Sequence, residues 1–321
     1  MVITYLLFII GIALLMKGAD YLINGSSSLA KKYGVPTLVI GLTIVAFGTS
    51  LPELVVNIFA GLKGESDVAL GNIIGSNIAN LLLILGISAL ICPVPMKVQS
   101  STTWKEIPFS LLAAVVLFIF ASSFLTKTNP AVLNISSGLI LLCFFVVFLF
   151  YVVSMSLKKK EKDKKLEIQK HSNFVIFLMI VGGLAMLYFG GKWVVNGAVG
   201  VARLMGFSEY LISATIVAVG TSLPELVTSI VAARKKDVDL AVGNVVGSNI
   251  FNIFFILGIT ALITPLIVPA AIFYDIVILM AITFLLFIFM FVGKRHVLEK
   301  WQGVLFLVLY VMYVAMLVIK G

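Results

Sequence analysis

The chain has little charge and few residues that bind soft metals. Only 12% of its 321 residues are charged, whereas 61% are hydrophobic. This balance excludes an ordinary soluble domain, in which charged residues make up about a quarter of the sequence. Two histidines and two cysteines are too few for a disulfide framework and argue against a zinc or copper cluster. We expect Cys92 and Cys143 to be reduced thiols packed among apolar side chains.

Long runs of apolar residues make up most of the sequence. The mean hydropathy is +1.17, and runs of about 20 apolar residues, long enough for a helix to cross a hydrocarbon core of ~30 Å, recur along the chain. We therefore predict an all-α polytopic membrane protein. The ten transmembrane helices are expected at about 2–30, 36–62, 68–91, 103–123, 131–157, 173–202, 208–233, 240–263, 270–293 and 299–319.

The net charge of +9 reflects topology and does not indicate a nucleic-acid partner. With the N-terminus outside, 17 of the 23 Lys and Arg residues fall in cytoplasmic loops. An excess of basic residues in cytoplasmic loops is typical of membrane proteins in that orientation. The prediction is a multi-pass protein of the plasma membrane, surrounded by lipid, with both termini outside. We expect a monomer.

The two halves of the chain repeat each other at a constant offset. Segments 43–55 and 215–227 are identical except that Phe47 corresponds to Val219, and GNIIGSNIAN (71–80) matches GNVVGSNIFN (243–252) at 7 of 10 positions. Five spans per half is an odd number, so the second half must cross the membrane in the opposite direction. Inverted repeats of this kind are typical of secondary transporters, with the binding site at the midplane.

The repeat defines the predicted domain organisation. The first five-helix repeat covers residues 1–157, with its most similar segment at 36–91. The second covers residues 173–321, with the corresponding segment at 208–263. Residues 158–172, which are rich in lysine, form a cytoplasmic linker between the two repeats.

Each repeat carries a proline and a glutamate inside an apolar span, in VAFGTSLPEL (45–54) and VAVGTSLPEL (217–226). Pro52 should break its helix and leave backbone carbonyls free. Such carbonyls are tolerated at membrane depth only beside protein or water. Glu53 and Glu225 are carboxylates at the centre of the membrane, which mark functional sites by default.

A buried ion pair is the alternative explanation for the two glutamates. Lys17 and Lys192 are the cations available within the spans. Lys17 is three residues from Asp20, which makes an intrahelical pair with that residue the expected arrangement. Lys192 can extend to the interface. Neither lysine is therefore expected to neutralise a glutamate.

Polar side chains follow the glutamates on the next span of each half. Asn72, Ser76 and Asn80 fall at i, i+4 and i+8 and form one stripe along a helix, which Asn244, Ser248 and Asn252 repeat. In isolation such a stripe more often joins helices. Beside two carboxylates, two broken helices and nearby hydroxyls, it indicates ligands. The set is all oxygen, which suits Ca²⁺ or the similarly sized Na⁺.

Glycines recur every seven residues on the first and sixth spans, at Gly11, Gly18, Gly25, Gly183, Gly190 and Gly197. Close helix packing through small residues is one explanation. The other is a track along which these two helices slide during transport.

The paired GTSLPE segments, each followed by GNxxGSNIxN, resemble the two α-repeats of the Na⁺/Ca²⁺ exchanger family within the calcium/cation antiporter superfamily. The resemblance covers both halves and implies alternating access, with helices broken in spans 2, 3, 7 and 8. It implies that Glu53 and Glu225 bind Ca²⁺ and also serve Na⁺, and that Ser50, Ser222, Asn80 and Asn252 line the central region. The carbonyls of Ala46, Thr49, Ala218 and Thr221, with Ser76 and Ser248, would complete the flanking sites.

The function predicted is that of a minimal prokaryotic antiporter that exchanges Na⁺ for Ca²⁺ and is neither an enzyme nor dependent on a cofactor. Asn252 resembles the K⁺-independent pattern, because K⁺-dependent exchangers carry Asp there. A K⁺-dependent exchanger and an H⁺-coupled Ca²⁺ antiporter are the alternatives. A cation channel is a more distant one, and it would conduct without a counter-ion.

Overall fold

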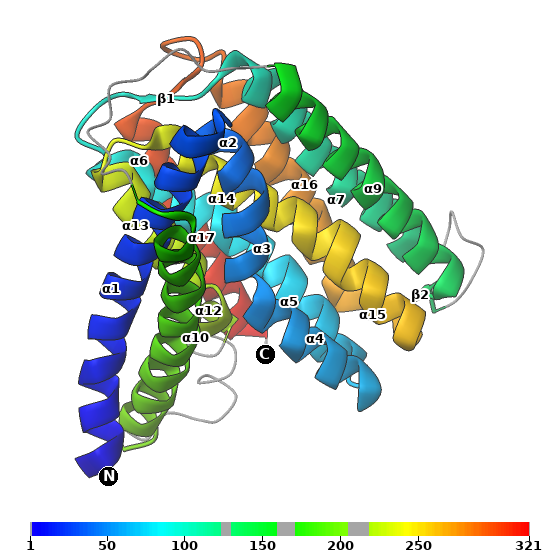
Figure 1. The fold of residues 1–321 in the computed structure, drawn as a ribbon. Helices are drawn as coiled ribbons and strands as arrows, with labels where there is room; N and C mark the ends of the chain where they lie inside the picture. Colours follow the sequence, from blue (N-terminus) through cyan, green and yellow to red (C-terminus); the bar gives the residue numbers. More distant parts are fainter. Residues whose placement is uncertain (1, 123–129, 159–170, 205–217, 321) are drawn as a thin grey trace.

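The computed structural model describes residues 2–122, 130–158, 171–204 and 218–320, and it is a bundle of long apolar helices (Figure 1). Within these residues, eight helical segments are long and apolar enough to cross a membrane, and a bent helix pair makes a ninth. The predicted seventh span, 208–233, begins outside the described residues, and α12 and α13 form its described part. The helical and membrane classes are thus confirmed.

The helices of the first half follow the predicted spans closely. They are α1 (Val2–Tyr33), α2 (Thr37–Ile40), η1 (Gly41–Val45), α3 (Ala46–Thr49), α4 (Leu51–Leu62), α5 (Ser66–Ala79), η2 (Asn80–Ile84), α6 (Leu85–Ile91), η3 (Thr102–Glu106), α7 (Ile107–Ala121) and α9 (Ile135–Lys158), where η denotes a π-helical segment.

The second half repeats this order. Its helices are α10 (Asn173–Leu204), α12 (Ala218–Thr221), α13 (Leu223–Arg234), α14 (Val238–Ile250), η5 (Phe251–Leu257), α15 (Gly258–Ile263), α16 (Ala270–Phe289) and α17 (Lys300–Lys320).

The predicted breaks occur in two places. The chain bends by 45° between α3 and α4, at Ser50, and Ser222 has nearly the same backbone angles between α12 and α13. The expected breaks in spans 3 and 8 are not seen. Ser66–Ile91 and Val238–Ile263 each run as one span that contains a π-helical segment, η2 or η5. These wider turns, which often occur at functional sites, take the place of a break.

Two small antiparallel strand pairs, which were not predicted, join loops at opposite ends of the bundle (Figure 1). β1 (Met96–Lys97) pairs with β4 (Val297–Leu298), and β2 (Val132–Leu133) pairs with β3 (Leu266–Ile267). The first pair joins the loop after α6 to the loop between α16 and α17. The second pair joins the loop after α15 to the loop between α7 and α9.

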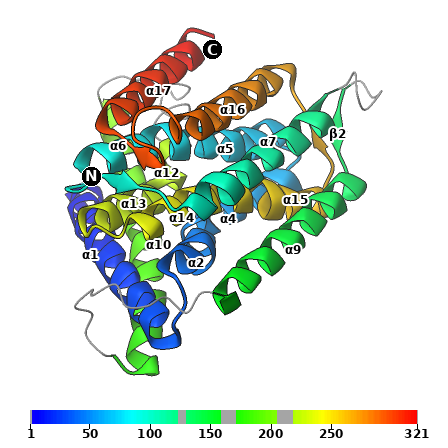
Figure 2. The same ribbon diagram turned by 90° about the horizontal axis from the view of Figure 1, so that it is seen from above.

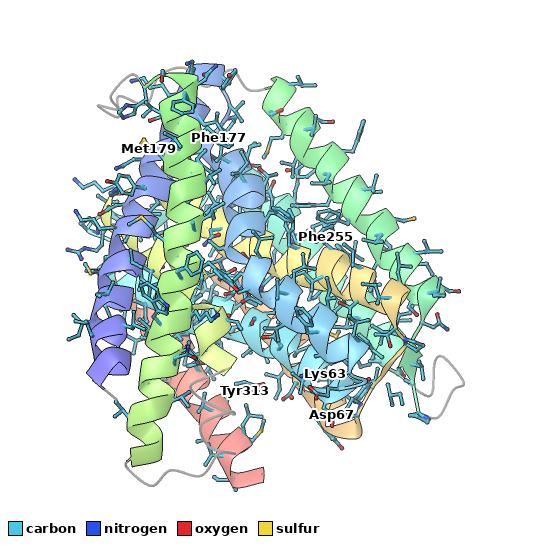
Figure 3. The ribbon with its side chains drawn as sticks, turned by 60° about the horizontal axis from the view of Figure 1, so that its bottom comes forward. Lys63, Asp67, Phe177, Met179, Phe255 and Tyr313 are labelled. Carbon is cyan, nitrogen blue, oxygen red and sulfur yellow. The ribbon has the colours of Figure 1, made fainter. Side chains whose placement is uncertain are left out.

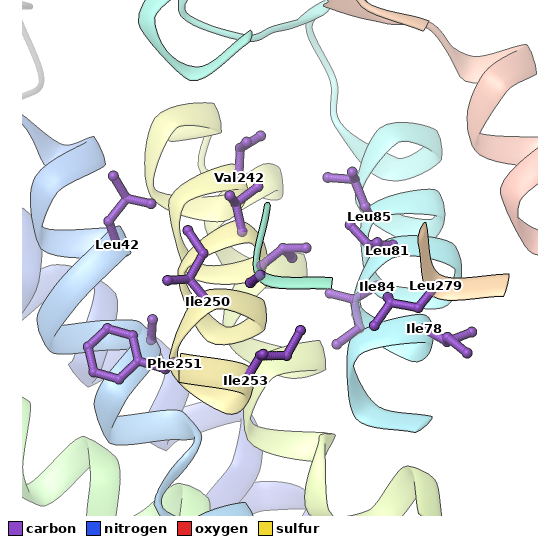
Figure 4. Close-up of a cluster of buried hydrophobic side chains, with 14 of the residues drawn as sticks. Leu42, Ile78, Leu81, Ile84, Leu85, Val242, Ile250, Phe251, Ile253 and Leu279 are labelled. Atoms are coloured by element: carbon purple, nitrogen blue, oxygen red, sulfur yellow. The ribbon is translucent and has the colours of Figure 1, made fainter. Parts of the chain in front are cut away.

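The two motif-bearing spans form the centre of the molecule. In Ser66–Ile91 and Val238–Ile263, 78% of the most apolar window is buried, against 33% in α1 and 28% in α10. Leu42, Leu81, Val242 and Ile250 belong to the buried cluster around them (Figure 4). The site segments therefore lie in the protein interior, away from lipid.

α1 and α10 lie side by side at one edge of the bundle (Figures 1 and 2) and pack through their glycines. A Cβ added at Gly18 would lie 2.9 Å from the carbonyl oxygen of Gly183, and one added at Gly183 would lie 2.8 Å from that of Gly18. Gly11 and Gly190 face each other in the same way. This confirms the close-packing explanation, because the two backbones touch along the glycine rows.

α1 is also tied to the turn between α13 and α14. The Asp20 carboxylate pairs with Lys235 at 2.7 Å, and the Lys235 ammonium donates to the Asn24 side-chain oxygen at 3.0 Å. The prediction that Asp20 pairs with Lys17 on the same helix was wrong, because the partner of Asp20 is Lys235. Lys235 reaches Asp20 through the tertiary approach of two segments, which residue spacing within one helix does not report.

Both thiols are free, and Cys92 is buried as expected. Cys143 is exposed on the surface of α9, so the expectation that it packs inside the protein was wrong. Lys63 follows the last residue of α4, and Asp67 lies in the first turn of α5 (Figure 3).

Adjacent glycines of α10 offer a matched test of the α1–α10 contact. Gly183→Ala places a methyl group against the α1 backbone, whereas nothing lies within 4 Å of a Cβ at Gly182. We expect Gly183→Ala to lower the free energy of unfolding by about 1–3 kcal/mol, the usual cost of overpacking. Gly182→Ala should be neutral or stabilising by up to ~1 kcal/mol, because alanine favours a helix. Thermal unfolding in detergent measures both, and equal stabilities would contradict the packing described.

Candidate cation-binding site

The two glutamates are buried in the first turns of their helices. Glu53 and Glu225 each expose 1% of their surface. Each stands two residues after Leu51 or Leu223, where α4 or α13 begins, with proline between them. Proline is tolerated in a first helical turn, since its missing N–H has no intrahelical partner there. The positive end of the helix dipole also favours a carboxylate at this position.

The serines before the prolines reach across to the opposite repeat. The Ser50 hydroxyl donates to Glu225 Oε1 at 2.8 Å, and the Ser222 hydroxyl lies 3.2 Å from Glu53 Oε1. Ser-x-x-Glu at a helix start is the signature of a capping box, yet neither serine side chain caps its own helix. Both hydroxyls are instead used between the repeats, which brings the two carboxylates into one site.

Ser76 completes the surroundings of Glu53. Its hydroxyl lies 3.4 Å from Glu53 Oε1 and 3.0 Å from the Ser222 hydroxyl. A hydroxyl carries one proton, so Ser222 donates either to the carboxylate or to Ser76 at any moment.

Several oxygens at the site are buried without a hydrogen-bond partner among the described residues. They are Glu53 Oε2, Glu225 Oε2, Asn80 Oδ1, Asn252 Oδ1 and Ser248 Oγ. A buried polar group left unpaired costs about 1–3 kcal/mol. A concentration of such acceptors around two carboxylates is the arrangement that a hard cation would satisfy.

The threonines also cross between the repeats. The Thr49 hydroxyl lies 3.2 Å from Asn244 Oδ1, and the Thr221 hydroxyl lies 3.2 Å from Asn72 Oδ1. Thr49 and Thr221 are the last residues of α3 and α12, directly before the breaks at Ser50 and Ser222.

The Ala46 carbonyl already has hydrogen-bond partners in its own segment. It accepts the Ser50 N–H at 3.0 Å and lies 3.3 Å from the Thr49 hydroxyl. Ala218 begins α12, immediately after an undescribed segment.

Three buried asparagines at the site escaped the sequence analysis. Asn57 donates to the Glu53 carbonyl at 3.2 Å. The side chains of Asn77 and Asn249 each donate to the backbone carbonyl of the other. Their side-chain oxygens accept from Asn252 and Asn80, respectively. Asn77 and Asn249 stand one residue off the polar stripe. The available signal was that they occupy equivalent positions in the two repeats.

A cavity of about 200 Å³ lies beside the site. Its lining includes Pro52, Lys192, Asn196, Thr221 and Pro224, from α4, α10, α12 and α13. The two prolines in this lining, Pro52 and Pro224, directly precede Glu53 and Glu225. The cavity therefore lies beside the helix turns that carry the two glutamates, against α10.

Comparisons with known proteins identify the family of the chain. The family model described as "Sodium/calcium exchanger protein" matches residues 3–154 and 175–319. The putative antiporter CaxA of Alkalimonas amylolytica is 36% identical, and the sodium/calcium exchanger MaX1 of Methanosarcina acetivorans is 33% identical, each comparison covering 98% of both chains. A structure of the sodium-calcium exchanger NCX_Mj soaked with zero Na⁺ and Ca²⁺ has a TM-score of 0.83 at 31% identity, covering 98% of this chain and 99% of that one. The Ca²⁺/H⁺ antiporter ChaA of Bacillus subtilis is more distant, at 25% identity over 249 residues.

Replacing one carboxylate by an amide tests the site directly. Glu225→Gln removes one of the two charges that would balance a divalent ion, and we expect it to abolish measurable Ca²⁺ binding by calorimetry in detergent. Glu106→Gln is the matched control, because Glu106 is also fully buried in a span but is bonded to Tyr151 outside the site. Unchanged binding in Glu225→Gln would remove that residue from the site.

Proposed function

Because the chain belongs to the sodium/calcium exchanger protein family, we propose that it is a secondary active antiporter that exchanges Na⁺ for Ca²⁺ across the membrane. The observation that carries the proposal is the crossed contact of Ser50 with Glu225 and of Ser222 with Glu53. It brings the acid of each repeat to the other repeat, so that one ion can be held by both.

The two carboxylates are the basis of exchange. Together they match the charge of one Ca²⁺ or of two Na⁺ ions, and both ions prefer oxygen ligands at similar distances. An ion of either kind occupies the oxygens that the other needs, so each displaces the other. A protein that changes its access only when the charges are neutralised then couples the two fluxes.

The proposed ligands are Glu53, Glu225, Ser50, Ser222, Asn80, Asn252, Ser76 and Ser248, with the carbonyls of Thr49, Thr221, Ala46 and Ala218. The unpaired oxygens of the glutamates, of Ser248 and of both asparagines support this set. The Ala46 carbonyl would have to bind an ion in addition to its present hydrogen-bond partners.

Access to the site would alternate by movement of α1 and α10 against the central spans. The glycine contacts support their movement as one unit, because the two backbones touch. The cavity between α10 and the two prolines would be the route to the site from one side. Ten spans, arranged as inverted repeats at 1–157 and 173–321 with a cytoplasmic linker at 158–172, would provide the equivalent route from the other side.

The basic residues support an orientation with both termini outside the plasma membrane. We propose a monomer, because a single chain supplies both carboxylates. Na⁺ is favoured over H⁺ as the coupling ion by the two GTSLPE segments, and Asn252 favours K⁺ independence.

Reconstituted vesicles test the function. Ca²⁺ uptake should follow an imposed Na⁺ gradient and cease when the gradient is collapsed, because the two ions use the same carboxylates in turn. Separate arms replace the Na⁺ gradient by a K⁺ or an H⁺ gradient, and Glu225→Gln vesicles provide the background. Equal uptake without any gradient of a counter-ion would indicate a channel, and uptake driven by H⁺ alone would make the protein a Ca²⁺/H⁺ antiporter.

A further inference from the structure

Four asparagines form a closed hydrogen-bonded network between the two central spans. Asn77 and Asn80 come from α5 and η2, and Asn249 and Asn252 come from α14 and η5. All four expose at most 1% of their surface. Each amide nitrogen donates to the opposite span, and every bond has a counterpart in the other repeat.

The network begins at two backbone carbonyls. The Asn249 side-chain NH₂ donates to the Asn77 carbonyl at 3.3 Å, and the Asn77 side-chain NH₂ donates to the Asn249 carbonyl at 3.2 Å. A carbonyl only accepts hydrogen bonds. The side-chain amides of Asn77 and Asn249 can therefore face these carbonyls with their nitrogens only.

The orientation of each first amide fixes that of a second. With its nitrogen held by the carbonyl, Asn249 presents Oδ1 to Asn80, whose NH₂ donates to it at 2.9 Å. Asn77 likewise presents Oδ1 to the NH₂ of Asn252 at 2.9 Å. Asn80 Oδ1 and Asn252 Oδ1 are the ends of the two chains of bonds, and both are buried without a partner among the described residues.

We propose that Asn77 and Asn249 are positioning residues, which hold the side-chain oxygens of Asn252 and Asn80 free for the transported cation. The proposal rests on the function proposed above. An asparagine amide keeps nearly the same shape when it flips so that its oxygen and nitrogen exchange places, which would present NH₂ donors to the ion. The crossed network excludes that flip, because it would place two acceptors face to face.

The network predicts which residues are coupled and which are not. Asn249 orients Asn80, and it does so through the backbone carbonyl of Asn77. Because that carbonyl remains in Asn77→Ala, this variant should leave the orientation of Asn80 intact. The effects of two substitutions should therefore be non-additive for Asn249 with Asn80 and for Asn77 with Asn252, which touch between spans. They should be additive for Asn77 with Asn80, which share one span.

A double-mutant cycle on the Ca²⁺ KM of exchange, with Ca²⁺ affinity in detergent as a second readout, tests this pattern. Asn249→Ala should raise KM by about 10–100-fold, as loss of a residue that orients a metal ligand typically does, with a smaller change in the maximal rate. Adding it to Asn80→Ala should cost little more than Asn80→Ala alone. Asn77→Ala combined with Asn80→Ala should instead be additive, and the cycle with Asn252→Ala should mirror both results.

The outcomes that overturn the proposal are distinct from failure of the proposed function. Thr283→Val is the control, because Thr283 is a buried residue of α16 whose hydroxyl donates to the Leu279 carbonyl of the same helix. Additive effects of Asn249→Ala and Asn80→Ala, or a KM in Asn249→Ala as little changed as in this control, would reduce Asn249 to a packing role. If Asn249→Ala does not fold, Asn249→Ser takes its place, because serine is too short to connect the Asn77 carbonyl with Asn80. Loss of Na⁺ dependence in the unmodified protein would contradict the exchanger, while the affinity cycle in detergent would still decide the role of Asn249.

Discussion

The structure depends on the enclosure of two like charges in one site within a membrane. Each carboxylate loses its hydration, and each repels the other, so the arrangement persists only where dipoles and hydrogen bonds replace water. The fold supplies these from local features of the chain. Both helices begin beside their glutamates, so that their positive ends face the acids, and the serine of each repeat turns to the acid of the other. Neither repeat provides this environment alone, which is why the two motifs must meet at one point.

The site is built by diverting groups from their ordinary local roles. Ser-x-x-Glu would cap a helix in a soluble protein, but here the hydroxyl of Ser50 bonds across the repeats. The π-helical segments η2 and η5 begin at Asn80 and one residue before Asn252. There the backbone hydrogen bonds depart from the i→i+4 pattern of a regular α-helix. Departures from local preference are expected at functional sites. In this chain they coincide with the oxygens that have no partner among the described residues, so local geometry and proposed chemistry indicate the same residues.

The sequence predicted the helical membrane class and the breaks beside Pro52 and Pro224, because apolar length and proline act locally, while the breaks expected in spans 3 and 8 are not seen. It failed where the outcome depended on how segments approach each other. Asp20 was assigned to Lys17 by helical spacing, but Lys235 reaches it from another helix. Asn77 was missed because the polar stripe was defined by a period of four, and Asn77 stands one residue away from Ser76 on that stripe.

The two repeats have equivalent residues at the proposed site but differ at the α13–α14 turn. The constant offset between the repeats relates each serine, threonine and asparagine of the crossed network to a residue of the same type. At the α13–α14 turn, Lys235 binds Asp20, but the counterparts of these two residues are Lys63 and Lys192, two cations that cannot form an ion pair. Two access states related by exact exchange of the repeats would have equal free energy, so a difference between them must come from such unmatched positions. Exposed ion pairs contribute about 0–1 kcal/mol each, enough to change the populations severalfold while the cation ligands stay the same. The unmatched Lys235–Asp20 pair lies outside the central spans that carry the proposed ligands, so a change in the balance between the two access states would not require a change in those ligands.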